Sequence, residues 1–264
     1  MDIGDDGDKA QRAIQSVEVG GRLLLALGAN PGPMTLKDLA AEAGLPASRA
    51  HPYLVSFGRL GLVQQDADSG RYGLGPAALQ LGLTALRQCD PVKAAVPVAE
   101  ALAAQTGQAV AVAVWGNFGP TVIRMIDARQ PLHVAMRAGT VMSMFGTATG
   151  RAFAAVLTPE RLADALAGVA LGNEGGVTTA QAPDAELASA RDEFNRHGCT
   201  RAVGRPIPGV NAFSAPVFDH DGEPAAVLTL LGHQDHVPSA WTSPMALAVK
   251  RAAGEVSARL GWRA

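Results

Sequence analysis

The chain has 264 residues, of which 48% are hydrophobic, and carries a formal net charge of −2. This length and apolar content predict a globular protein with two domains of unequal size. The longest apolar runs are far shorter than the roughly 20 residues that a membrane span requires, and the N-terminal segment MDIGDDGDKA is acidic where a signal peptide would be basic and then apolar. We therefore expect a soluble, cytoplasmic protein that does not contact a membrane.

The cysteines and the first nine residues say more about the cellular compartment and the N-terminus. The two cysteines, Cys89 and Cys199, form neither a CxxC pair nor a set with metal-ligand spacing, which fits a reducing compartment. The first nine residues hold four aspartates and few apolar residues, so residues 1–9 are predicted to be a disordered acidic tail.

The pattern after the tail predicts two helices. Apolar residues recur at helical spacing over residues 11–27, and the segment GANPGP then ends this first helix. A second, short helix begins at Thr35, which has with Asp38 nearly the spacing of a capping box. Gly44 ends it, because glycine is a common C-terminal stop. A tight turn is expected there.

The next segments predict a third helix and a hairpin. Residues 45–60 have a helical apolar stripe but include Pro52, which removes one backbone hydrogen bond and clashes with the preceding turn. The segment GLVQQDADSGRYGLG then has the pattern of two short strands around an Asp-Ser-Gly turn. Residues 10–75 are therefore predicted to form a winged helix-turn-helix, whose third helix enters the DNA major groove.

The motifs of this region resemble those of the IclR family of bacterial transcription regulators. The family carries Leu-Pro-x-Ser-x-x-His-x-x-Leu, then Gly-Leu/Tyr-Val, then Asp-x-x-Thr/Ser-Gly-x-Tyr-x-Leu-Gly, and this chain has LPASRAHPYL, GLV and DADSGRYGLG in that order. The resemblance continues through GPAALQLGLTAL, AAQTGQAVAVAV, the glycine loop AGTVMSMFGTATGRAFAAVL and GVNAFSAPVFDHDGEPAAVLTLLG. It covers nearly the whole chain from about residue 11.

The resemblance implies a fold class and an assembly. The fold class is α+β, with the winged helix-turn-helix, a linker helix within residues 76–90 and a GAF-like α/β effector-binding domain over residues 91–264. Beyond residue 90 the pattern itself alternates between expected helices and strands of a mostly antiparallel sheet, with helices at 92–105, 150–157, 184–197 and 244–260 and strands at 109–114, 122–126, 213–217 and 225–231. The family forms homodimers, often paired into tetramers.

The predicted partner is double-stranded operator DNA. The expected contacts come from Thr35, Ser48, Arg49, His51, Pro52, Tyr53 and Arg71. Arg49 is predicted to read guanine O6 and N7, although a phosphate contact or a solvated arginine remains open. For Thr35 and Arg71 a phosphate contact competes with an ordinary cap and an ordinary surface charge, and His51 alternatively caps or packs.

Pro52 leads to a prediction about the third helix, and the charge of this domain leads to a prediction about the number of copies that bind DNA. We hypothesise that the third helix begins late or kinks, with Ser48 or His51 capping it. Between Lys9 and Gly75 there are seven basic and five acidic residues, so one copy neutralises few phosphates. Two copies reading two half-sites are therefore expected.

The resemblance also implies an effector pocket between the sheet and the glycine loop. Its predicted lining residues are Gly139, Met142, Met144, Phe145, Thr147, Ala212, Ser214, Thr229 and Leu231. Ser143 and Phe145 stand where many members have Pro and His, and Ala212 and Leu231 replace polar residues of members that bind small keto acids. The expected effector is therefore a small aromatic or hydrophobic molecule. Alternatively, Met136, Met142 and Met144 form one packed face.

No catalytic motif points to an enzyme or a cofactor. The sequence lacks GxSxG, HExxH, a Walker loop and a well-placed GxGxxG, and the histidines of HQDH (residues 233–236) are expected in a surface loop rather than a metal site. We expect a ligand-responsive repressor of a catabolic or efflux operon, although the residues leave the sign of the coupling open. The alternative is a sensor module whose DNA binding is degraded by Pro52.

Overall fold

The computed structural model describes residues 13–129, 136–164 and 183–263. The chain divides into two compact units, one ending at Gln88 and the other beginning at Cys89. The predicted acidic tail, residues 1–9, lies outside the described residues. Among the residues that are described, no helix has both the length and the apolar character needed to cross a membrane.

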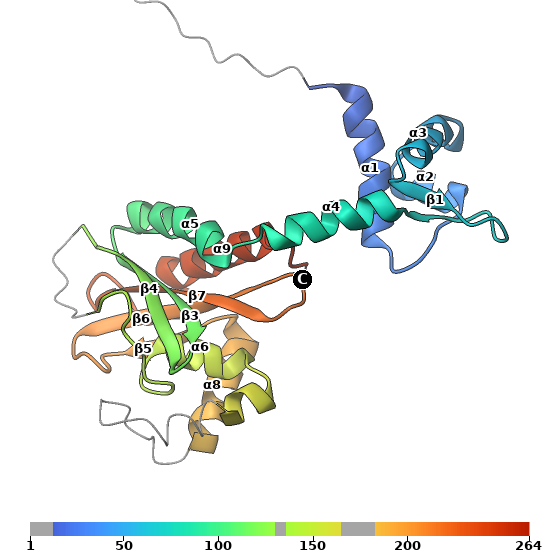
Figure 1. Ribbon diagram of the computed structural model, residues 1–264. Coiled ribbons are helices and arrows are strands. Elements are labelled where there is room, and N and C mark those ends of the chain that lie inside the picture. The colour runs from blue at the N-terminus through green and yellow to red at the C-terminus, as the bar shows by residue number, and fades with distance from the viewer. Residues whose placement is uncertain (1–12, 130–135, 165–182, 264) are drawn as a thin grey trace, which may run out of the picture. The chain divides into compact units, whose positions relative to one another are not determined.

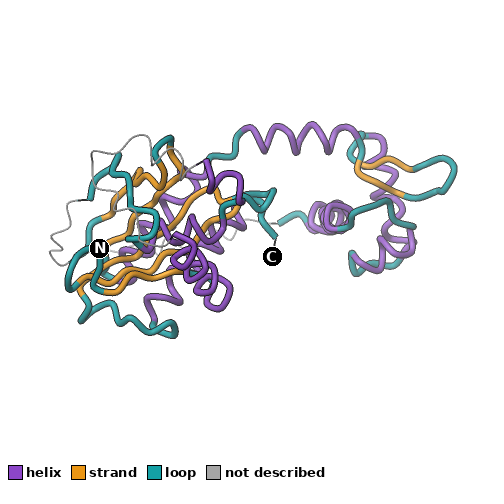
Figure 2. The backbone as a smooth tube through the Cα atoms, turned by 90° about the horizontal axis from the view of Figure 1, so that it is seen from below, coloured by secondary structure: helices purple, strands orange, loops and turns teal. Residues whose placement is uncertain are grey.

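The N-terminal unit has the predicted order of helices followed by a hairpin (Figures 1 and 2). Its elements are α1 (Gln15–Ala29), α2 (Leu36–Glu42), α3 (Ala47–Arg59), β1 (Val63–Gln65), β2 (Tyr72–Leu74) and α4 (Pro76–Arg87). The two strands pair antiparallel, with Val63 opposite Leu74. The predicted winged helix-turn-helix is confirmed in this order of elements.

One small core holds these helices and the hairpin together. Leu23 of α1, Leu39 of α2 and Leu54 of α3 are fully buried in it, and Val63 and Tyr72 add the inner side of the hairpin. Burying a leucine side chain stabilises the fold by about 1.5 to 3 kcal/mol. The three helices therefore converge on one apolar point, and their other faces remain free for contacts outside the unit.

The C-terminal unit is built on a five-stranded sheet in the order β4-β3-β7-β6-β5, with every neighbouring pair antiparallel. Its elements are α5 (Pro91–Thr106), β3 (Ala109–Gly116), β4 (Gly119–Ile126), α6 (Ala148–Val156), α8 (Pro183–His197), β5 (Thr200–Val203), β6 (Val210–Phe218), β7 (Pro224–His233) and α9 (Pro244–Arg259). Strand β5 was not predicted, because its four residues are too few to show an alternating pattern.

Helices cover both faces of this sheet (Figure 1). Val110 and Val112 of β3 pack with α5 and α9 in the larger core, whereas Ala113 packs with Phe153 of α6 in a second cluster. Successive side chains of a strand point to opposite faces, so β3 serves both layers. Helix α8 packs in turn against α6.

A buried arginine joins α6 to α8. The side chain of Arg151 is 1% exposed, and its guanidinium lies 2.7 Å from Glu186 Oε2 and 2.9 Å from Glu193 Oε1, both on α8. It also donates a hydrogen bond of 3.1 Å to Ser189 Oγ. A buried charge requires such partners because its own desolvation is costly.

Replacing Arg151 with methionine should therefore destabilise the protein by about 2 to 4 kcal/mol, because two partly buried carboxylates lose their counter-charge. The matched control is Arg161→Met, since Arg161 pairs with Glu223 across 3.0 Å but both side chains are 46% exposed. That change should cost about 0 to 1 kcal/mol. Urea unfolding measures both, and equal losses would contradict this account of Arg151.

The two cysteines differ in environment. Cys199 is fully buried, and burial raises the pKa of its thiol to about 11, whereas Cys89 is exposed. The thiolate is the reactive form, and Cys199 remains a neutral thiol at any pH well below its raised pKa.

At pH 8 a disulfide reagent should therefore label one thiol per native chain and two in guanidinium chloride. Absorbance of the released thiolate counts them. In a Cys89→Ser variant the native protein should not react on the same timescale. Fast labelling of that variant would show that Cys199 is accessible.

Candidate nucleic-acid interface and effector pocket

The turn between α2 and α3 is set by a cap and a glycine. The Asp38 N–H donates to Thr35 Oγ1 over 3.2 Å, and the Thr35 hydroxyl donates to Asp38 Oδ2 over 2.7 Å, so the expected cap is present. Gly44 has φ +65°, a value that favours glycine. The Leu45 N–H then bonds the Ala40 carbonyl over 2.8 Å, which closes the turn before α3.

Helix α3 begins earlier than predicted. It runs without interruption from Ala47 to Arg59, its N-cap is Pro46, and no side chain caps it. The expectation of a late start capped by Ser48 or His51 is wrong, because both residues already lie inside the first turns. The Arg49 and Ala50 N–H groups bond the Pro46 carbonyl instead.

The face of α3 opposite its buried residues carries the predicted contact residues. Ser48, Arg49, His51 and Pro52 are exposed, while Ala50 and Leu54 anchor the helix in the core. Tyr53 differs, because its ring is half-buried and packs on the core. A Cβ placed on Gly20 of α1 would lie 3.1 Å from this ring, so the missing side chain of Gly20 leaves room for it.

Pro52 lies in the middle of α3 on this exposed face. Having no N–H, it cannot donate to the carbonyl of Ser48, four residues earlier. That carbonyl is left for solvent or a bound partner. The Ser56 hydroxyl donates to the Pro52 carbonyl over 3.0 Å.

The hairpin turn is held by local hydrogen bonds. The Ser69 N–H and hydroxyl donate to Asp66 Oδ1 at 2.7 and 2.6 Å, and the hydroxyl bond is the main cause that lowers the pKa of Asp66. Arg71 is exposed and donates to the Pro33 carbonyl over 3.2 Å. One nitrogen of this guanidinium thus ties the hairpin to the loop before α2.

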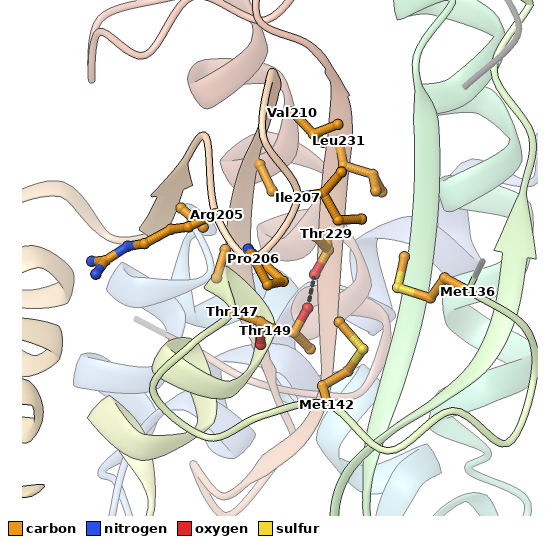
Figure 3. Close-up of a pocket in the computed structure, with 13 residues that line it drawn as sticks. Met136, Met142, Thr147, Thr149, Arg205, Pro206, Ile207, Val210, Thr229 and Leu231 are labelled. Carbon is orange, nitrogen blue, oxygen red and sulfur yellow. Dashed lines mark hydrogen bonds between the residues drawn. The ribbon is translucent and has the colours of Figure 1, made fainter. Parts of the chain in front are cut away.

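The C-terminal unit contains a small pocket between α6, the end of the glycine loop and the β5–β6 connection (Figure 3). Its enclosed volume is about 50 Å³, and its lining is mostly apolar. The lining residues are Met136, Met142, Thr147, Ala148, Thr149, Ala202, Arg205, Pro206, Ile207, Val210, Ala212, Thr229 and Leu231. Five of the predicted effector residues are among them: Met142, Thr147, Ala212, Thr229 and Leu231.

A chain of buried hydroxyl groups forms the polar part of this wall. The Thr149 and Thr229 hydroxyls lie 2.8 Å apart, as the dashed line in Figure 3 shows, and the Ser214 hydroxyl lies 2.7 Å from that of Thr229. Ser214 does not itself line the pocket, and lies behind Thr229 in the sheet pairing of β6 with β7. Thr149 was not predicted.

The first turn of α6 is fixed by a close backbone approach. A Cβ on Gly150 would lie 2.1 Å from the Ser143 carbonyl oxygen, so only glycine fits there. The Gly150 N–H donates to Thr147 Oγ1 over 3.0 Å, and the Thr147 hydroxyl donates to the Ser143 carbonyl over 2.8 Å. The Thr147 side chain is therefore engaged as the helix cap.

Three predicted lining residues lie elsewhere. Met144 and Phe145 are buried in the cluster with Phe153 of α6, because the glycine loop turns them into the core. Gly139 has φ +92°, and its N–H donates to the Val122 carbonyl over 2.7 Å, so it pairs the loop with β4. The structure corrects these three expectations.

Several of the lining residues that sequence reasoning missed lie in or next to the β5–β6 connection. Arg205, Pro206 and Ile207 reach the pocket from this segment, and Val210 reaches it from the first position of β6. Because β5 was not predicted, no strand was expected before this segment, and nothing in the sequence indicated that it lies beside the pocket. The only available signal was a charged residue in an otherwise apolar and proline-rich stretch shortly before a predicted strand.

The HQDH segment begins with the last residue of β7, His233, and continues as a turn, close to the expected surface loop. His233 Nδ1 lies 3.2 Å from Asp235 Oδ2, and both side chains are exposed. Within the described ranges, no group of three or more His, Cys, Asp or Glu side chains is placed to hold a metal ion.

Comparison with known proteins agrees with both units. A family model described as the IclR helix-turn-helix domain matches residues 16–67, and one described as bacterial transcriptional regulator IclR, C-terminal, matches residues 83–258. The transcriptional repressor IclR of Escherichia coli (strain K12) is 23% identical over 252 residues, which cover 94% of this chain and 90% of that protein.

Two further similarities extend over nearly the full length. The glycerol operon regulatory protein of Streptomyces griseus is 27% identical over 256 residues, which cover 95% of this chain and 98% of that protein. The crystal structure of Pseudomonas aeruginosa HmgR has a TM-score of 0.85 and 33% identity, and the match covers 94% of this chain and 99% of that one. The chain belongs to the IclR family of bacterial transcriptional regulators.

Proposed function

We propose that this ligand-responsive regulator is a homodimeric repressor that binds its operator through α3 and is controlled by a small, mostly apolar effector. The observation that carries the proposal is the division of α3 into two faces. Ala50 and Leu54 fix the helix in the core, and Ser48, Arg49 and His51 face solvent together. Repression is supported by relatives that are named as repressors.

The proposed DNA contacts divide by chemistry. Arg49 reads a base edge, because its planar fork matches guanine O6 and N7. Arg71 contacts a phosphate with the N–H groups that do not bond Pro33. The Thr35 hydroxyl reaches a phosphate only if it releases Asp38. A bacterial protein that acts on DNA works in the cytoplasm, and we infer this location.

The effector pocket supports a proposal on the kind of operon. Its lining is apolar apart from hydroxyl groups and Arg205. Such a pocket selects a small organic molecule rather than a compact dianion. We infer that the regulated operon serves the catabolism or efflux of such a compound. The effector acts by binding one arrangement of the DNA-binding units more tightly than another.

Dimerisation is supported by α4, in which no residue is buried. Leu79, Leu83 and Leu86 lie at helical spacing on one side of it and are 64%, 46% and 42% exposed. Leu81, 63% exposed, lies on the opposite side. An exposed apolar stripe of this kind marks a protein contact.

The alternative function is a sensor module that does not bind DNA. It is favoured by one observation, the unpaired backbone position that Pro52 creates in the middle of α3.

The deciding experiment is fluorescence anisotropy with labelled DNA from upstream of the protein's own gene and with an unrelated fragment, at two salt concentrations. We expect tighter and salt-dependent binding to the upstream DNA, because phosphate contacts release counterions. Arg49→Ala should weaken specific binding by about 1 to 3 kcal/mol, the value of a bidentate base contact.

Arg124→Ala is the matched control, since Arg124 is an exposed arginine of β4 in the other unit. It should leave DNA binding unchanged. Equal binding of the wild-type protein to both fragments would exclude the regulator proposal. If Pro52→Ala then created specific binding, the sensor alternative would be supported.

The dimer proposal predicts that the triple change Leu79→Ser, Leu83→Ser and Leu86→Ser produces monomers and weakens operator binding, because the apolar contact between copies is lost. Sedimentation equilibrium measures the mass. Leu81→Ser should retain the wild-type mass and affinity. A triple variant that stays dimeric would show that the interface lies elsewhere.

A further inference from the structure

We infer that Pro52 makes α3 a reader of one A·T base pair in the operator. The Ser48 carbonyl, which Pro52 leaves without its helical donor, accepts a hydrogen bond from the adenine N6 amine. The Pro52 ring contacts the thymine methyl group of the same pair. The inference deepens the proposed function and rests on it, and it gives the proline a part in choosing the DNA sequence.

Pro52 lies at the centre of the exposed face of α3. An α-helix turns by about 100° per residue, so Pro52, which is two residues from both buried anchors, Ala50 and Leu54, lies about 200° from each of them. Ser48, one turn earlier, and Ser56, one turn later, lie on the same side of the helix, and all three are exposed. A helix in the major groove turns this side toward the base edges.

The Ser48 carbonyl is the acceptor that this side offers. In a regular α-helix the N–H of residue 52 bonds the carbonyl of residue 48, but proline has no N–H. Carbonyls on the solvent side of a helix tilt outward, so this one is directed away from the core. The Pro52 carbonyl one turn later differs, because the Ser56 hydroxyl donates to it over 3.0 Å. Once DNA excludes water from this face, the Ser48 carbonyl needs a donor from the DNA.

Short side chains let the backbone of α3 come close to the bases. The line along the centre of the exposed face consists of Ser48, Pro52 and Ser56, none of which has a long side chain. A long side chain at position 52 would hold the backbone away from the groove floor. A backbone group can therefore take part in reading the sequence here.

The Pro52 ring selects which base supplies the donor. The major groove presents two exocyclic amines, adenine N6 and cytosine N4. An A·T pair also presents the thymine methyl group on the same edge, whereas cytosine has no methyl group there. Burying a methyl group against an apolar ring is favourable. An acceptor beside an apolar ring thus matches an A·T pair better than a G·C pair.

The test is a base-analogue scan of the upstream DNA, narrowed by footprinting to the bound half-sites and measured by fluorescence anisotropy with the full-length protein. Each adenine is replaced in turn by 2-aminopurine, which still pairs with thymine but carries its amine in the minor groove. At one adenine of a half-site this should weaken wild-type binding about three- to tenfold, as expected for loss of one hydrogen bond. Uracil in place of its thymine should weaken binding about two- to fourfold, because one methyl contact is lost.

Pro52→Ala supplies the missing N–H and removes the ring, so both effects should disappear together. This variant should bind the original and the two modified DNAs to within about twofold of one another. Pro97→Ala is the matched control, since Pro97 also lies exposed inside a helix, α5 of the other unit, and it should retain both wild-type losses. Melting temperatures near that of the wild-type protein show that the variants are folded.

A scan in which no A·T pair shows both losses would overturn the inference, as would losses that persist in Pro52→Ala. Complete loss of specific binding by folded Pro52→Ala would also contradict it, because only one base pair is assigned to the proline. Specific binding of the wild-type protein without a proline-dependent pair would reject the inference alone. Equal binding of the wild-type protein to upstream and unrelated DNA would reject the proposed function and the inference with it.

Discussion

The backbone contact at Gly150 organises the C-terminal unit. With no Cβ at this position, the first turn of α6 lies directly against the carbonyl oxygens of Ser143 and Met144. Thr147 then caps the helix, and the Thr149 hydroxyl of α6 bonds that of Thr229 on β7. A larger residue at this position would push the loop away from the helix and break these hydrogen bonds. The polar wall of the pocket therefore depends on the close contact of the two backbones.

The same helix has two roles on its two sides. Toward the sheet it presents hydroxyl groups to the pocket, and toward α8 it presents Arg151, which is bound by Glu186 and Glu193. If a ligand displaced α6, α8 would have to move with it, because a buried arginine must keep its carboxylate partners. Helix α6 is thus a physical connection between the pocket and the rest of its unit, although the coupling to DNA depends on which arrangement the ligand favours.

In the N-terminal unit, the core is small and leaves faces of α3 and α4 exposed. A few leucines gather three helices at one point, the outer face of α3 is exposed, and no residue of α4 is buried. The low net charge of this unit predicts that a single copy binds DNA weakly. In the proposed dimer, joined through the exposed leucines of α4, two copies of the exposed α3 face would contact about twice as many phosphates as one copy.

The sequence by itself determined the order of elements, the hairpin, the cap at Thr35 and the family, because these depend on local periodicity, turn chemistry and motif spacing. The family resemblance also placed Thr229 and Leu231 in a pocket wall, and both residues line the pocket. The sequence failed at the start of α3, at the short strand β5, and for Met144 and Phe145. Those features depend on which way a loop turns its side chains and on which segments cross the sheet. Only the packed chain decides them, because contacts between residues far apart in sequence fix loop direction, and Arg205 reaches the pocket through such contacts alone.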